Sequence, residues 1–198
     1  MPDAKTICNL GLAKIGSTSI NNLNPPKTVI EKLCVAGYNQ WRDSELKKRR
    51  WVFATIVTTL APTPASPIKN VEYPYQYHIP GDMLRPIRPA APIACQWVIR
   101  GQFFYSRGNT LPIEYIRRVN ETEMSDPLFI DVLAWRIAQE LVEPTTQSNE
   151  KFQKAQIGYR DAVSEASAQN AFILEPQRVN GVDTDYEWIA ERTGYVYG

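Results

Sequence analysis

Histidine, cysteine and long apolar runs are all scarce in this sequence. Its 198 residues include one histidine, His78, and three widely spaced cysteines, Cys8, Cys34 and Cys95. No CxxC pair or Cys/His cluster occurs, so we expect reduced thiols in a cytosolic setting and no bound metal. No apolar run approaches the roughly 18 residues of a membrane span. The N-terminus also lacks the basic segment and apolar core of a secretion signal, so we expect no membrane insertion.

An excess of one charge sign is also missing. The chain has 22 basic and 21 acidic residues, for a formal net charge of +1. A dedicated nucleic-acid-binding domain usually has a pI above about 9. The neutral balance therefore argues against tight nucleic-acid binding, and the length suits one domain, or one domain with an appendage.

Motifs of known catalytic chemistry are absent from the sequence. There is no phosphate-binding GxxxxGK[ST], no GxGxxG and no HExxH, and no nucleophile motif accompanies His78. A carboxylate pair acting as acid and base remains an open alternative. Its candidates are Glu121, Glu123, Asp126, Asp131 and Glu140, for which capping and solvation are the simpler roles. We predict no catalytic residue and no cofactor.

Two helices are predicted in the first 50 residues. The first follows Asp3 as N-cap and has its small and apolar residues on one face: Ala4, Ile7, Cys8, Gly11 and Ile15. The second is expected to start with Asn24 as cap and Pro25 at the first helical position. It should end near Arg49 or Arg50. Its solvent-facing side is predicted to carry Arg42, Asp43, Glu45, Lys47 and Lys48.

Two further helices are predicted after residue 120. Asp126 should cap the third, Pro127 should open it, and Pro144 should stop it. Apolar residues cover more than half of its circumference, which is typical of a helix in the middle of a bundle. The fourth, at about 146–172, is expected to have one apolar face, made of Phe152, Ala155, Tyr159, Val163, Ala166 and Ile173.

The intervening residues, 51–119, are predicted to form an antiparallel β region. A strand should begin at Trp51, a proline-rich loop should follow at 61–70, and CQWVIRGQFFYS should form a hairpin with Gly101 at its turn. We therefore predict an α+β, mainly α fold. Residues 1–50 and 120–174 form a discontinuous four-helix bundle, 51–119 are inserted between helices 2 and 3, and 175–198 form an extended arm.

The C-terminal arm, 175–198, combines acidic and apolar residues without a clear period. It carries five acidic and two basic residues. Solvated tails rarely keep many aromatic residues, so we expect the arm to order against a partner. The candidate contact residues are Tyr186, Trp188, Ile189, Tyr195 and Tyr197. The alternative is that the arm folds back on its own bundle or frays, as termini often do.

A basic run, Lys47, Lys48, Arg49 and Arg50, precedes Trp51 at the end of the second predicted helix. Cations in a last helical turn interact favourably with the helix dipole, by roughly 0.3–1 kcal/mol each. That role is favoured over a nucleic-acid contact because the whole chain is nearly neutral. These five residues are nevertheless our candidates for a junction or an interface.

An ordered series of short motifs resembles a known family. The motifs are LAKIG (12–16), SINNL (19–23), Tyr38-x-x-x-Arg42, WVFA (51–54), YQYHIPGDMLR (75–85), IEYIRRV (113–119), DPLF (126–129) and AQEL (138–141). Their order is similar to that of the tail tubular protein A family, the head-to-tail adaptors of short-tailed bacteriophages, over about 7–175. The chain departs from the family pattern at Arg50, where a proline usually precedes the tryptophan.

The resemblance implies a structural virion protein rather than an enzyme. Such adaptors form a twelve-subunit ring between the portal protein and the tail nozzle (a tail tubular protein B-like partner). They extend the DNA channel without sequence-specific binding and anchor tail fibres or spikes. The expected location is the virion neck, after assembly in the host cytoplasm. The alternatives are a virion-associated cell-wall hydrolase, a head-completion (stopper) protein of a long-tailed phage, and a nucleic-acid module centred on Lys47–Arg50.

Overall fold

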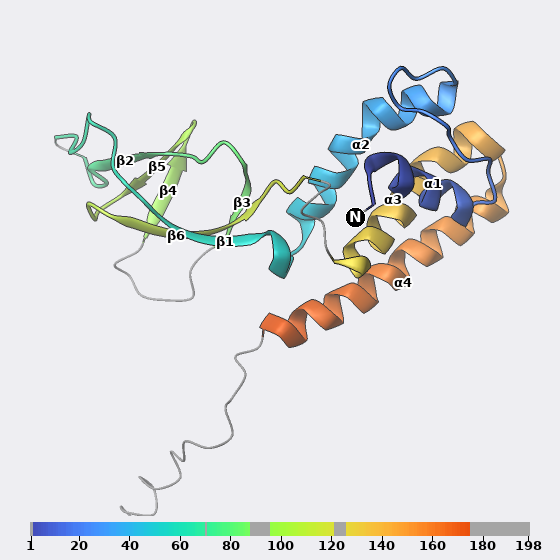
Figure 1. The fold of residues 1–198 in the computed structure, drawn as a ribbon. Helices are drawn as coiled ribbons and strands as arrows, with labels where there is room; N and C mark the ends of the chain where they lie inside the picture. The colour runs from blue at the N-terminus through green and yellow to red at the C-terminus, as the bar shows by residue number, and fades with distance from the viewer. Residues whose placement is uncertain (1, 70, 88–95, 121–125, 175–198) are drawn as a thin grey trace, which may run out of the picture.

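The computed structural model describes residues 2–69, 71–87, 96–120 and 126–174. Helices and strands lie at opposite ends of an elongated chain (Figure 1). The helices are α1 (Ala4–Lys14), α2 (Val29–Lys48), α3 (Pro127–Thr146) and α4 (Asn149–Leu174), with a 3-10 turn η1 at Val52–Ala54. The strands are β1 (Thr55–Leu60), β2 (Tyr75–His78), β3 (Met83–Ile87), β4 (Trp97–Arg100), β5 (Phe103–Ser106) and β6 (Leu111–Arg117).

Helix α3 is the centre of the bundle and packs against α1, α2 and α4. Eight of its residues are buried: Phe129, Val132, Leu133, Ala134, Ile137, Ala138, Leu141 and Val142. The prediction of an α+β, mainly α fold is therefore confirmed, and so is the central position of the third helix. None of the helices in the described part of the chain is long and apolar enough to cross a membrane.

Two helix starts lie where their capping residues predict. The Asp3 carboxylate accepts a hydrogen bond of 2.8 Å from the Thr6 amide at the start of α1. The Asp126 carboxylate accepts one of 2.9 Å from the Leu128 amide, and Pro127 occupies the first position of α3. In both cases an acidic side chain satisfies amide groups that the helix itself leaves unpaired.

The predicted start of α2 is wrong. Thr28, not Asn24, caps the helix, and it forms a reciprocal capping box with Glu31. The Glu31 amide donates to Thr28 Oγ1, and the Thr28 amide donates to Glu31 Oε2 at 2.8 Å. Further amides, including that of Lys27 at 2.7 Å, donate to the same carboxylate. These hydrogen bonds, that from Thr28 first, lower the pKa of Glu31 to about 2.

The predicted stop at Pro144 is also wrong. Helix α3 continues to Thr146, and Gln147 ends it in a left-handed conformation with φ of 49°. The missing amide of Pro144 removes one donor near the end of the helix. The hydroxyls of Thr145 and Thr146 donate to helix carbonyls, to Leu141 O and Val142 O. A proline is therefore tolerated in this last turn, and α4 starts three residues later than predicted.

The β region consists of two three-stranded antiparallel sheets, in the orders β1-β6-β3 and β2-β5-β4. The predicted hairpin is present as β4 and β5, with Gly101 at φ of 60° in its turn. Strand β6 contributes to two cores, because successive side chains in a strand point to opposite faces. Ile113 and Tyr115 join the core between the sheets, whereas Ile116 joins the core of the bundle.

Two of the three cysteines lie in the bundle core. Cys8 on α1 and Cys34 on α2 are free, as the sequence predicts, and both are buried. The pKa of the Cys8 thiol is raised, first by its hydrogen bond with the Cys34 thiol and then by burial. Cys95 lies outside the described residues.

Candidate functional site

Glu45 is the centre of the junction between the bundle and the β region. Its side chain is fully buried in α2, with 0% exposure. The Tyr159 hydroxyl of α4 donates to Glu45 Oε2 at 2.9 Å. Lys48 lies 2.6 Å from Oε1, and Arg49 lies 3.0 Å from Oε2. A buried carboxylate needs such partners, since an unpaired charge in the interior is costly.

The basic run thus has mainly intramolecular partners. Lys48 and Arg49 neutralise Glu45, and Arg50 forms an ion pair with Glu114 on β6. The Lys48 ammonium also lies 5.7 Å from the centre of the Tyr159 ring. Lys47 is exposed. This arrangement favours the helix-end role of the run over a nucleic-acid contact, because three of its four cations already face a carboxylate.

Trp51 fastens the chain where the helix ends. Its indole nitrogen donates to the Glu45 carbonyl at 3.0 Å, and its ring meets Phe129 of α3 edge to face, with 4.9 Å between ring centres. Next to it, the Val52 amide donates to the Asn170 side chain of α4 at 3.2 Å. The prediction that a strand begins at Trp51 is therefore wrong. Trp51 packs its ring in the bundle core, and the 3-10 turn η1 separates it from the first residue of β1.

The prediction of a solvent-facing side for α2 is wrong at two positions. Arg42 and Glu45 are buried, whereas Lys47 and Lys48 are exposed as predicted. Arg42 lies 2.9 Å from Asp43, which also accepts a 2.7 Å hydrogen bond from Arg118 of the segment after β6. Hydropathy alone predicts that Arg42 and Glu45 face solvent, but their ion pairs allow both side chains to be buried. The spacing of Glu45 to Lys48 and Arg49 signals the pairing, though not the burial.

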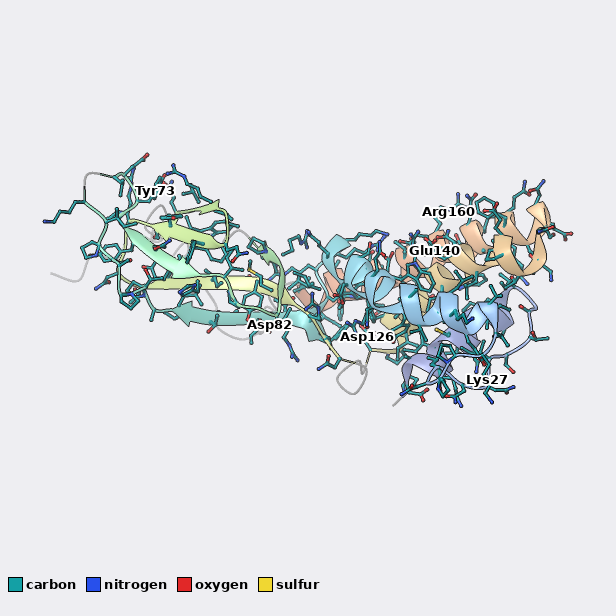
Figure 2. The ribbon with its side chains drawn as sticks, turned by 90° about the horizontal axis from the view of Figure 1, so that it is seen from above. Lys27, Tyr73, Asp82, Asp126, Glu140 and Arg160 are labelled. Carbon is teal, nitrogen blue, oxygen red and sulfur yellow. The ribbon has the colours of Figure 1, made fainter. Side chains whose placement is uncertain are left out.

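The described candidate acid and base carboxylates are individually engaged, and two of them, Asp126 and Glu140, lie far apart. Asp126 caps α3, Asp131 forms a 2.7 Å ion pair with Lys14, and Glu140 pairs with Arg136. Asp126 and Glu140 are 14 residues apart on α3, or roughly 21 Å at the helical rise, and Figure 2 shows them well apart. Catalytic carboxylate pairs in glycosidases lie about 5–9.5 Å apart. Glu121 and Glu123 lie outside the described residues.

Within the described residues, neither His78 nor the Cys, Asp and Glu side chains form a cluster that could bind a metal ion. His78 is exposed on β2, and its ring packs at a tilt against Phe103, with 5.0 Å between ring centres. No group of three or more His, Cys, Asp or Glu side chains that could hold a metal ion occurs among residues 2–69, 71–87, 96–120 and 126–174. An open hollow of about 480 Å³ beside the α3–α4 turn is lined by Glu143, Gln147 and Phe152, among others.

Two helices of the bundle each expose several large apolar side chains, and α1 exposes one, Leu10. On α2 they are Val29, Leu33 and Val35, and on α4 they are Phe152, Ile157, Phe172 and Ile173. Phe152 and Ile173 were predicted to face the core. Ile173 has the same helical phase as the buried Ala166, yet 57% of it is exposed. The apolar end of α4 extends beyond the bundle, so period alone does not decide burial there (Figure 1).

The candidate arm residues Tyr186, Trp188, Ile189, Tyr195 and Tyr197 lie outside the described residues. The structure therefore brings together only the junction candidates, Lys48, Arg49 and Trp51, around Glu45, with Arg50 beside them on Glu114. No protein-family model matches the chain, and no curated protein matches it either. Glu45 and Tyr159 are the members of this site that the sequence did not single out.

Proposed function

We propose that the chain is a structural subunit of a bacteriophage head-to-tail adaptor. In this role, copies of it form a ring beneath the portal, extend the DNA channel, and hold the nozzle and the fibres or spikes. The order of motifs from LAKIG to AQEL suggests the role, and the helical bundle with its inserted β region is compatible with it. The arm at 175–198 is proposed to contact the portal.

The observation that carries the proposal is the exposed apolar surface on two different helices. A closed ring requires two distinct side faces on each subunit, which meet head to tail. Helices α2 and α4 lie on different sides of α3 and each exposes several large apolar side chains (Figure 1). Apolar residues gathered on a surface commonly mark protein contacts, and on α2 the exposed Val29 and Leu33 lie one helical turn apart. The near-neutral chain also suits a channel wall, since a strongly basic wall would retain DNA.

The direct test is electron microscopy of the purified chain mixed with purified portal rings. A second ring stacked on the portal is the expected result, with no ring from the chain alone. Ile157→Lys adds a charge to an exposed apolar position of α4 and should lower ring occupancy. Gln102→Lys adds the same charge in the exposed β4–β5 turn and should not. Portals that stay bare, or equal effects of both variants, contradict the proposal.

The rival functions give different results in simple assays. A cell-wall hydrolase would clear peptidoglycan in a zymogram, and alanine at Asp126, Asp131 or Glu140 would abolish clearing. A nucleic-acid module would shift DNA in a salt-dependent manner, and neutralising residues 47–50 would remove the shift. We expect neither activity, because the carboxylates are separately engaged and three of the four cations are paired.

A further inference from the structure

Strand β1 forms an open edge of its sheet. Among the described residues, the sheet order β1-β6-β3 leaves one side of β1 without a neighbouring strand. Its six residues, TIVTTL, include no charged residue, proline or glycine. Within the described residues, no main-chain hydrogen bond reaches its outer side. Such an edge presents a row of unpaired amide and carbonyl groups, which is a template for another strand.

The edge at β2 is covered, in contrast. The Thr63 amide of the proline-rich loop donates to the Gln76 carbonyl at 2.7 Å, and the Gln76 amide donates to Ser66 Oγ at 2.9 Å. Both groups of Gln76 therefore face the loop instead of a further strand. A loop over an edge is one of the usual protections against strand addition.

The two remaining edges carry different protections. Strand β3 contains Pro86, which has no amide hydrogen to donate, and its register shifts between Met83 and Arg85. Strand β4 has four residues and ends in the charged Arg100. Proline, bulges, charges and short length all discourage edge pairing. Among the four edges of the two sheets, β1 is the one on which none of these features occurs within the described residues.

The side chains of β1 are also left partly uncovered. Ile56 pairs across the strands with Tyr115, which places it on the face of the core between the sheets. It is nevertheless 37% exposed, and Val57 on the opposite face is 72% exposed. A strand added beside β1 would cover apolar surface on both faces, which is favourable at roughly 25 cal/mol per Å².

We propose that β1 pairs with β1 of a second copy of this chain, antiparallel and about a two-fold axis. Charge favours a copy as the occupant. When β1 pairs with itself, only Thr, Ile, Val and Leu residues face one another, so no like charges meet across the axis. Glu114, which lies opposite Val57 on β6, is already paired with Arg50. The contact is self-complementary, as a two-fold interface requires, and joins two three-stranded sheets into one of six strands.

This dimer is a different assembly from the proposed adaptor ring. A ring of twelve is built from head-to-tail contacts, whereas the β1 contact joins the same surface of two copies. The dimer therefore belongs to the free chain. Loss of the dimer does not imply loss of the ring, and the portal-mixing experiment does not test the dimer.

Sedimentation equilibrium of the full chain over a range of concentrations tests the pairing. We expect a concentration-dependent dimer, and slower amide hydrogen exchange at Thr55–Leu60 when the concentration is raised. Val57→Lys places two lysines near the axis and should weaken dimerisation about tenfold or more, or ~1.4 kcal/mol. Val71→Lys, at an exposed loop position, should leave it unchanged.

Three outcomes overturn the proposal. The first is a chain that stays monomeric at its highest soluble concentration. The second is a dimer that Val57→Lys and Val71→Lys affect equally. The third is growth into open-ended fibres instead of a closed dimer, because uncharged β-branched segments can also stack without limit. Circular dichroism checks that both variants are folded. We expect both to fold, because the side chains of Val57 and Val71 are exposed.

Discussion

The buried carboxylate of Glu45 leads to the most specific prediction on stability. Glu45→Gln keeps the shape of the side chain but removes its charge. The substitution weakens the contacts with Lys48 and Arg49 and changes the acceptor for the Tyr159 hydroxyl. Arg136 of α3 also lies 3.9 Å from the Glu45 carboxylate, so the perturbation is centred on the contacts of α2 with α3 and α4.

The expected loss follows from which groups are left unpaired. Removing one partner of a fully buried ion pair costs about 3–5 kcal/mol. Here the cations are not fully buried, since the side chains of Lys48 and Arg49 are 41% and 26% exposed and can regain water. Hydrogen bonds to charged groups contribute about 1.5–3 kcal/mol. We therefore expect Glu45→Gln to lower the free energy of unfolding by about 2–3 kcal/mol, or roughly 4–12 °C in Tm.

Urea and thermal unfolding followed by circular dichroism measure this loss. Asp131→Asn is the matched control, because Asp131 is a 47% exposed carboxylate whose ion pair with Lys14 involves none of the partners of Glu45. Exposed ion pairs contribute about 0.2–1 kcal/mol. Equal destabilisation by the two substitutions would refute the reasoning. In a double-mutant cycle, Tyr159→Phe should be non-additive with Glu45→Gln, because the two side chains share a hydrogen bond.

Three further predictions concern other parts of the chain. The pKa of Glu31 is lowered from an ordinary 4.5 to about 2, so its stabilising effect is complete above pH 4.5 and is lost as the pH falls toward 2. In urea titrations, the stability of Glu31→Gln should therefore fall less between pH 4.5 and pH 2 than that of the unsubstituted chain. Gly11→Ala places a Cβ 2.8 Å from the carbonyl oxygen of Ala134 in α3, so Tm should fall with a loss of about 1–3 kcal/mol. Deleting 176–198 should leave the circular dichroism of the bundle unchanged and weaken portal binding in pull-down; unaltered binding contradicts the portal-contact role of the arm.

Local signals in the sequence predict much of the bundle. Asp3 and Asp126 mark helix starts by chemistry that acts within three residues, and the apolar pattern of residues 127–142 places α3 at the centre. The start of α2 was missed because two cap signals compete. Asn24–Pro25 has the right residues, but the Thr28–Glu31 capping box satisfies more amides. Counting the hydrogen bonds that each candidate cap offers distinguishes them.

The site could be predicted only in part, because burial of a charge depends on tertiary partners. The spacing of Glu45, Lys48 and Arg49 indicates an ion-paired helix end. Nothing local indicates that Tyr159, more than 100 positions away, reaches the same carboxylate. Likewise, hydropathy suggests burial of Ile173, whereas the end of α4 extends past the helices that would cover it. Long-range geometry decides both cases.

The distribution of paired and unpaired groups separates the junction from the surfaces available to partners. At the junction, Glu45 has partners on α2, α3 and α4. The ion pairs of Arg50 with Glu114 and of Arg118 with Asp43 fix the β region on the bundle. At β1 and along the outer side of α4, by contrast, apolar side chains and strand amides have no described partner. Covering apolar surface drives most protein association. Substitutions that alter assembly without unfolding the chain should therefore fall at β1 and α4, and substitutions at the basic run should alter stability first.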